Sequence, residues 1–161
     1  IQVARPWLSG YGGTTPERHR KVRRSLTAMK LSHDLSASRL LRHWVDLSYT
    51  ERCKFAGYWK TERMVRPAGE KVKASVYTNP KLRRAAIVFF NTAEQDQYLA
   101  DTTLQINALI PVRGTKLTAR RIFDLESGKT VATDFEDGRY VIKEPFLVKR
   151  EEFRLLGIEA E

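Results

Sequence analysis

The pattern of hydrophobic and polar positions changes along the chain, from a helical spacing in residues 1–66 to an alternating one afterwards. Early in the chain, Val22, Leu26 and Met29 recur every three or four positions, which is typical of one buried face of a helix. Upstream of them, Thr14–Glu17 combines a hydroxyl cap, a proline in the first turn and an early acid, all of which favour a helix start. We therefore expect a helix of about 16 residues here.

The rest of residues 1–66 also reads as helical. The spacing i, i+1, i+4, i+5 predicts a second helix after Ser36 or Ser38, marked by Leu40, Leu41, Trp44 and Val45. A third, short helix is expected from Thr50 to about Tyr58. At the start of the chain, Ile1–Ala4 reads as the stub of a strand, followed by the glycine-bearing loop Ser9–Thr14. That loop is either a flexible connection or an anion cradle, although it lacks the spacing of a P-loop or dinucleotide fingerprint.

Beyond residue 67 the pattern is that of strands. Val72, Ala74 and Val76 alternate with polar neighbours, as in a strand with one wet face. Ala85–Phe90 is apolar on both faces, which indicates a central strand, and Asp137-Gly138 is a two-residue hairpin turn. The predicted strands are Lys71–Thr78, Arg84–Asn91, Thr102–Leu109, Leu117–Asp124, Thr130–Thr133, Arg139–Lys143 and Glu152–Glu159.

This spacing predicts a mainly β protein, an antiparallel β-sandwich of about seven to eight strands preceded by a helical N-terminal segment. We expect a helical, basic segment over 1–66 and the β-sandwich domain over 67–161.

Charge follows the same division. Residues 1–66 hold 14 Lys or Arg and 5 Asp or Glu, a net charge of +9, whereas residues 67–161 hold 15 and 14, a net charge of +1. The basic excess therefore belongs to the first segment and suggests two regions of different history.

The sequence contains no run of 18 apolar residues, so no membrane span or membrane partner is expected. The chain begins at Ile1 without a signal-peptide pattern, and we expect a mature product or part of a longer protein.

The sequence offers little for metal or redox chemistry. Cys53 is the single cysteine, so no internal disulfide can form, and a small buried residue is its expected role. The three histidines, at positions 19, 33 and 43, show no i, i+4 pair. We expect no metal site and no cofactor.

No catalytic set emerges from the residues. The acids of 1–66 each have an ordinary surface explanation, and those of the strand region cluster in turns, where we expect them to be solvated: Asp124, Glu126, Asp134, Glu136 and Asp137. Residue order alone supports no Ser-His-Asp or Cys-His arrangement. Whether the chain is itself an enzyme stays open at this point.

Two kinds of binding residue remain. Trp7 and Tyr11 flank the glycine loop, and aromatic faces stack on sugar rings, although Trp more often belongs to a core. His33-Asp34 is either a polar pair lining a cleft or a helix cap and turn. The basic stretch, with Arg20, Lys21, Arg23 and Arg24, is either a solvated helix face or a phosphate-binding surface.

The stretch from Phe55–Trp59 onward resembles the C-terminal part of certain large glycoside hydrolases and glycoside-hydrolase-like proteins, in which a (β/α)8 barrel is followed by a small β-sandwich. The residues that carry the resemblance are the strand Val72–Tyr77, the Asn79-Pro80 turn, the strand ending at Asn91, Leu104–Ile106, the turn Phe123–Gly128 and the closing Phe146 to Leu156 segment. The resemblance covers about 100 to 140 residues.

The resemblance implies that Ser25–Asp34 is the last barrel helix and that the loop 7–15 is the last βα loop, where such barrels build their sites. Trp7, Tyr11, His33 and Asp34 would then be carbohydrate contacts, and the catalytic acids would lie upstream of Ile1. A complete barrel needs about 250 residues, so none fits in the 161 residues of this chain.

We therefore expect a non-catalytic, accessory β-sandwich region of a carbohydrate-active protein, partnered by a catalytic barrel domain or partner chain and in contact with carbohydrate. The alternative is a nucleic-acid-binding or ribonucleoprotein component that uses the basic patch at 18–24. The compartment is not indicated.

Overall fold

The structure is a computed structural model, and it describes residues 54–150 and 152–161. Its largest element is an antiparallel five-stranded sheet with the strand order β1-β3-β4-β11-β7. The strands are β1 (Lys54–Ala56), β3 (Val72–Asn79), β4 (Arg84–Asn91), β11 (Phe153–Ala160) and β7 (Ala119–Asp124).

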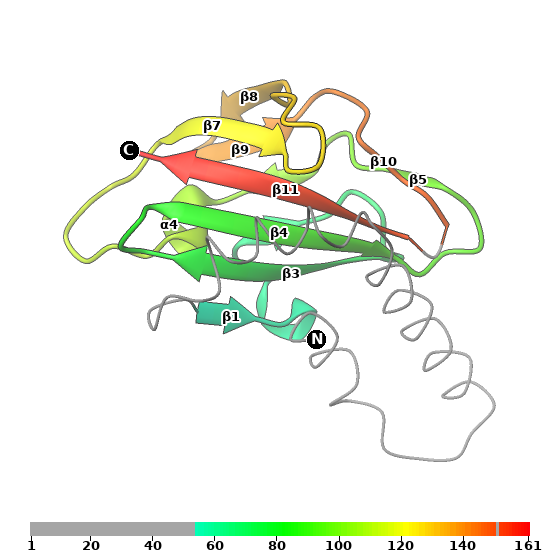
Figure 1. The fold of residues 1–161 in the computed structure, drawn as a ribbon, viewed down its shortest axis with the longest axis horizontal. Coiled ribbons are helices and arrows are strands. Elements are labelled where there is room, and N and C mark those ends of the chain that lie inside the picture. The colour runs from blue at the N-terminus through cyan, green and yellow to red at the C-terminus, as the bar shows by residue number, and fades with distance from the viewer. Residues whose placement is uncertain (1–53, 151) are drawn as a thin grey trace, which may run out of the picture. The chain divides into compact units, whose positions relative to one another are not determined.

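A second layer lies behind this sheet in the view of Figure 1, where β8, β9 and α4 are visible behind β7, β11 and β4. It contains a four-stranded antiparallel sheet with the order β2-β6-β9-β8. Its strands are β2 (Val65–Arg66), β6 (Thr103–Leu104), β9 (Arg139–Ile142) and β8 (Thr133–Glu136). The remaining elements are the 3-10 turn η1 (Tyr58–Lys60), the helical turn α4 (Ile106–Leu109) and the two-stranded ribbon of β5 (Gln97–Tyr98) and β10 (Leu147–Val148).

The hydrophobic core lies between the two sheets. Alternate residues of the long strands point into it, among them Val76 of β3, Phe89 of β4 and Leu156 of β11, each no more than 1% exposed. The second layer contributes Leu104 and Ile142, which are also fully buried in the same cluster. Two antiparallel sheets that share one core make a β-sandwich, and the predicted fold class is therefore confirmed.

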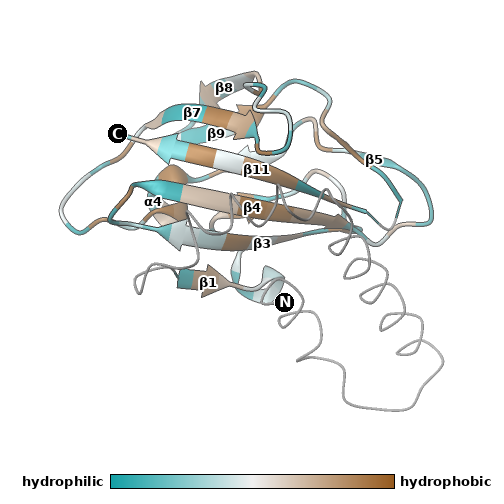
Figure 2. Ribbon diagram, in the orientation of Figure 1, coloured by the Kyte–Doolittle hydropathy of each residue, from teal (hydrophilic) through white to brown (hydrophobic). Residues whose placement is uncertain are grey.

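The five-stranded sheet is also apolar on its other face. Ala86, Val88 and Leu155 point away from the core, and each is 2–3% exposed without belonging to the core cluster. At the sheet edge the rings of Phe55 and Tyr77 lie 4.6 Å apart. Figure 2 shows the resulting hydrophobic stretches along β3, β4 and β11. Strands with apolar residues on both faces are typical of a sheet covered by a layer on each side.

The sequence predicts the long strands well. Strands β3, β4, β9 and β11 lie within about one residue of their predicted bounds. The Asp137-Gly138 hairpin is also confirmed, because β8 pairs with β9 across it with Glu136 opposite Arg139. Both turn residues have positive φ, 48° for Asp137 and 77° for Gly138, as a type I′ turn requires.

The expected strand over Thr102–Leu109 is wrong beyond Leu104. The chain leaves β6 and forms the helical turn α4, in which Leu109 N–H donates to the carbonyl of Gln105 at 2.9 Å. The side chains of Ile106, Leu109 and Ile110 are all buried. Their spacing i, i+3, i+4 fits one side of a helical turn, and it overrides the apparent alternation of period two.

Two smaller predictions are also corrected. The short helix expected from Thr50 to Tyr58 is not formed in its described part, because Lys54–Ala56 pairs with β3 as strand β1. The strand expected at Thr130–Thr133 lies further along, at Thr133–Glu136, because the hairpin turn fixes its register. The first two predicted helices, the strand stub and the glycine loop lie outside the described residues, and the division at residue 66 stays a prediction.

Candidate functional site

Asp124 is the one acidic side chain buried among the described residues, and it is therefore the first candidate for acid–base chemistry. It ends strand β7 and is 3% exposed. This corrects the expectation that all the turn acids are solvated. Register places Asp124 opposite Leu156, so its side chain shares the core-facing side of the sheet with Arg154, two residues away on β11.

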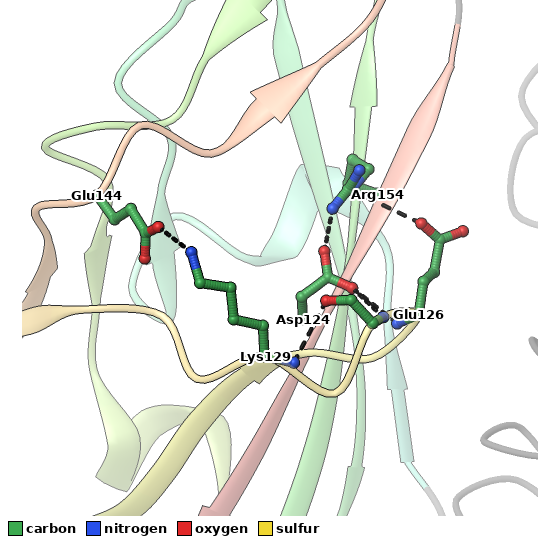
Figure 3. A network of polar contacts seen from close by, with 6 residues as sticks. Asp124, Glu126, Lys129, Glu144 and Arg154 are labelled. Carbon is green, nitrogen blue, oxygen red and sulfur yellow. Dashed lines mark hydrogen bonds and ion pairs between the residues drawn. The ribbon is translucent and has the colours of Figure 1, made fainter.

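Hydrogen bonds account for both carboxylate oxygens of Asp124. Its Oδ1 accepts from the backbone N–H groups of Glu126 and Ser127, each at 2.8 Å, and its Oδ2 accepts from the guanidinium of Arg154. Figure 3 shows Arg154 above Asp124, with dashed lines from the Arg154 side chain to the carboxylates of both Asp124 and Glu126. The first two contacts form an Asx turn, and the third pairs the buried charge.

The same turn is closed by its backbone. Gly128 N–H donates to the carbonyl of Asp124 at 2.8 Å, and Asp124 N–H donates to the carbonyl of Lys129 at 2.8 Å. Gly128 has φ +70°, a conformation that glycine adopts without steric cost. The carboxylate of Asp124 is therefore the centre of a turn, and its position is set by the chain around it.

Arg154 is held from two further directions. Its guanidinium carbon lies 4.9 Å from the ring centroid of Phe146, and its Nε is 3.7 Å from Glu126 Oε2. A cation over an aromatic ring and beside two carboxylates is well stabilised. Because Asp124 is 3% exposed and both its oxygens already accept hydrogen bonds from within the chain, a substrate has no access to it as a proton acceptor. We interpret this cluster as a structural pin between β7 and β11.

The remaining carboxylates in ion pairs lie at the surface. Lys129 Nζ and Glu144 Oε1 are 2.6 Å apart, and the hydrogen bond from Lys129 holds the pKa of Glu144 below its ordinary value. Lys143 Nζ lies 2.9 Å from Glu136 and 3.9 Å from Asp134. The hydrogen bond to Glu136, followed by the charges of Glu136 and Asp134, raises the pKa of Lys143. These contacts are of the kind that contribute little to stability individually.

Glu159 of β11 bridges two arginines across the sheet. Its Oε2 is 2.7 Å from Arg120 and its Oε1 is 3.6 Å from Arg84. The hydrogen bond from Arg120 lowers the pKa of Glu159 from its ordinary value of 4.5, against the opposing effect of burial. In turn, the same bond raises the pKa of Arg120.

We predict that Glu159→Gln destabilises the protein at neutral pH but not in acid. The pKa of Glu159 is lower in the folded than in the unfolded chain, so its contribution is full above the unfolded pKa and disappears as the pH falls through the folded one. The effect should stay within about 1 kcal/mol, as for other pairs near the surface. Thermal unfolding of both proteins between pH 7 and pH 2 measures it. If the difference in stability between the two proteins is the same at pH 2 as at pH 7, the ion pairs of Glu159 do not account for it.

Two aromatic residues form a second candidate functional site. Tyr58 and Trp59 lie edge to face on η1 with ring centroids 5.1 Å apart, and Trp59 is 51% exposed. The Trp59 ring rests against the backbone of Gly57, where an added Cβ would lie 2.4 Å from the ring carbon Cη2. Glycine at position 57 therefore allows a fixed, half-exposed indole at the surface, a feature that the sequence shows only as a cluster of aromatics.

The predicted site residues all fall in the part of the chain that the structure does not describe. These are the carbohydrate-contact candidates Trp7, Tyr11, His33 and Asp34, and the basic residues Arg20, Lys21, Arg23 and Arg24. Their roles stay predictions. Within residues 54–150 and 152–161, no three His, Cys, Asp or Glu side chains are grouped so as to hold a metal ion. The same residues contain no helix long and apolar enough to cross a membrane.

No protein-family model and no curated protein matches this sequence. Among solved structures, the fold is similar to α-L-fucosidase isoenzyme 2 from Paenibacillus thiaminolyticus, with 10% identity, a TM-score of 0.43, and coverage of 64% of this chain and 17% of that chain. It is also similar to α-galactosidase I from Mortierella vinacea, with 12% identity, a TM-score of 0.35, and coverage of 56% and 21%. Both structural neighbours are glycoside hydrolases, and this chain spans 17% and 21% of their lengths.

Proposed function

We propose that this chain is a non-catalytic, accessory β-sandwich region of a carbohydrate-active protein. In this role it packs against a catalytic domain or partner chain and contacts sugar. The observation that carries the proposal is that the five-stranded sheet is apolar on both faces, while only one of these faces belongs to the sandwich core. A sheet with two apolar faces suits a domain that packs against further polypeptide.

The state of the acidic residues supports the non-catalytic part of the proposal. Glycoside hydrolysis needs two carboxyl groups that flank a sugar, one to donate a proton and one to act as base or nucleophile. The buried acid, Asp124, has its oxygens committed to a turn and to Arg154. Glu144 and Glu159 are committed to Lys129 and to arginines. These three acids thus act as structural partners.

The sugar-contacting part rests on aromatic side chains. Trp59 offers a fixed and half-exposed indole face, and the sequence resemblance adds Trp7 and Tyr11 in the loop 7–15. The apolar face of a pyranose ring stacks on such side chains. His33 and Asp34 would supply polar contacts to hydroxyl groups.

Affinity electrophoresis through gels that contain soluble polysaccharides tests the sugar contact. We expect the 161-residue chain to be retarded by at least one polysaccharide, and the retardation to weaken in Trp59→Ala, Trp7→Ala or Tyr11→Ala. Phe135→Ala is the matched control, because Phe135 is an aromatic side chain that is 61% exposed on β8 and is not among the proposed contacts. Retardation by no polysaccharide would contradict the proposal. Salt-sensitive oligonucleotide binding that is lost in Arg20→Gln and Lys21→Gln would instead support the nucleic-acid alternative.

A further inference from the structure

The solvent-facing side of the four-stranded sheet holds a cavity of about 290 Å³ whose lining is strongly basic. Arg63 and Arg66 approach it from the segment around β2, and Arg139 approaches from β9. Among the lining residues that the structure describes, Glu62 is the one acid, so these residues carry three positive charges against one negative charge.

The three arginines have no acidic partner in the described part of the chain, where no carboxylate lies within 4 Å of the guanidinium groups of Arg63, Arg66 or Arg139. Register places Glu136 opposite Arg139, but the carboxylate of Glu136 is paired with Lys143 at 2.9 Å. Three guanidinium groups at one cavity repel each other unless an anion lies between them.

Gln105 can hold one end of the Arg139 guanidinium. With its amide oriented so that both ends are satisfied, Gln105 Oε1 accepts from Arg139 Nε at 3.1 Å and Nε2 donates to the carbonyl of Arg63 at 2.9 Å. The bond at Nε leaves the two terminal nitrogens of Arg139 for a ligand. A hydrogen bond at Nε restricts the Arg139 side chain, which lowers the entropy cost of binding.

The wall that carries Arg63 and Arg66 is anchored as well. Thr61 is buried, and its hydroxyl donates to the carbonyl of Ala74 on β3 at 2.8 Å. Its carbonyl accepts from Met64 N–H at 2.7 Å, and Gln105 N–H donates to the carbonyl of Met64 at 2.9 Å. The cavity thus lies on backbone that is fixed to both sheets, which is what a preorganised binding site needs.

We propose that this cavity binds an oxyanion, a carboxylate, sulfate or phosphate group, on a ligand about the size of one sugar ring. Arginine forks match the paired oxygens of such groups, and Thr103 at the cavity adds a hydroxyl that can donate a further hydrogen bond. A volume of about 290 Å³ admits a small group. None of the described residues in the lining is aromatic, which disfavours a nucleic-acid base, since bases stack on aromatic rings. This proposal goes beyond the accessory function above and does not depend on it.

Isothermal titration of the 161-residue chain at low salt tests the site with four probes: glucuronate, glucose, inorganic sulfate and inorganic phosphate. We expect at least one of the anions to bind, and glucose to bind at least about tenfold more weakly than glucuronate if the carboxylate is the recognised group. If sulfate or phosphate binds and glucuronate does not, the cavity recognises the inorganic anion or its esters rather than a carboxylate. In either case the affinity for the anion should fall as the ionic strength rises.

The variants Arg66→Gln and Arg139→Gln should each weaken anion binding by about tenfold or more, because each removes a charge-assisted contact. Arg113→Gln, which changes an exposed arginine outside the cavity, should leave binding unchanged. All three positions are exposed, so the fold, followed by circular dichroism, should be retained. The proposal is overturned if none of the anions binds, if Arg113→Gln weakens binding as much as Arg139→Gln does, or if the cavity variants lose only oligonucleotide binding.

Discussion

Phe89→Ala should destabilise the protein by about 3–5 kcal/mol, the largest effect that we expect from a single substitution. Phe89 is 0% exposed in the middle of β4, the strand between β3 and β11 in the five-stranded sheet. Removing the ring takes away its burial and leaves a cavity that strands paired on both sides cannot easily close. Since domains of this size are stable by about 5–15 kcal/mol, the variant should lie close to the unfolding threshold.

Urea unfolding at pH 7 measures this prediction, with the midpoint expected to fall at an unchanged slope. Phe135→Ala provides the matched control, because the same substitution is made on the other sheet at a ring that is 61% exposed and contacts Tyr140 at 5.0 Å between centroids. Its cost should stay below about 1 kcal/mol. Equal costs for the two variants would mean that the core does not lie between the sheets as described.

Asp124→Ala should cost about 2–3 kcal/mol. The substitution removes the acceptor of three hydrogen bonds, including the contact with Arg154, and leaves that guanidinium beside Phe146 without its closest carboxylate. Breaking a fully buried ion pair costs about 3–5 kcal/mol, but the side chain of Arg154 is 34% exposed, so water compensates for part of the loss.

A double-mutant cycle separates the ion pair from the turn. Arg154→Met removes the pair and keeps the Asx turn, so it should cost less than Asp124→Ala, and the two effects should be clearly non-additive. Asp134→Ala is the control, because Asp134 is an acid that is exposed on β8 with a distant partner at 3.9 Å, and it should change stability by less than about 0.5 kcal/mol. If Asp124→Ala lowers stability no more than Asp134→Ala does, the Asp124 cluster does not stabilise the contact between β7 and β11 as we infer.

The long strands could be predicted because their sequence signals agree with one another. In β3, alternation, β-branched residues and the Asn79-Pro80 turn all indicate the same strand. In β4, the continuous apolar run indicates a central strand with two covered faces, and the structure places it there. The hairpin at Asp137 was predictable because a two-residue turn with positive φ has a strict residue preference.

Other features could not be predicted because they depend on distant parts of the chain. Strands β2, β5 and β10 contain two residues each, which is too short for any period to show. The burial of Asp124 depends on Arg154, 30 residues further along. The basic cavity likewise combines residues from β2, β6 and β9, so local charge patterns do not reveal it. The Trp59 surface depends on Gly57, whose missing Cβ makes room for the ring.

We propose above all that this chain supports carbohydrate chemistry without performing it. The most direct measurement is the release of nitrophenol from a panel of α- and β-linked nitrophenyl glycosides by the purified 161-residue chain at high concentration. We predict release at the spontaneous rate for every glycoside in the panel. Turnover above that rate, lost in a variant of a single acid such as Glu62→Gln that still melts like the parent protein, would contradict the account.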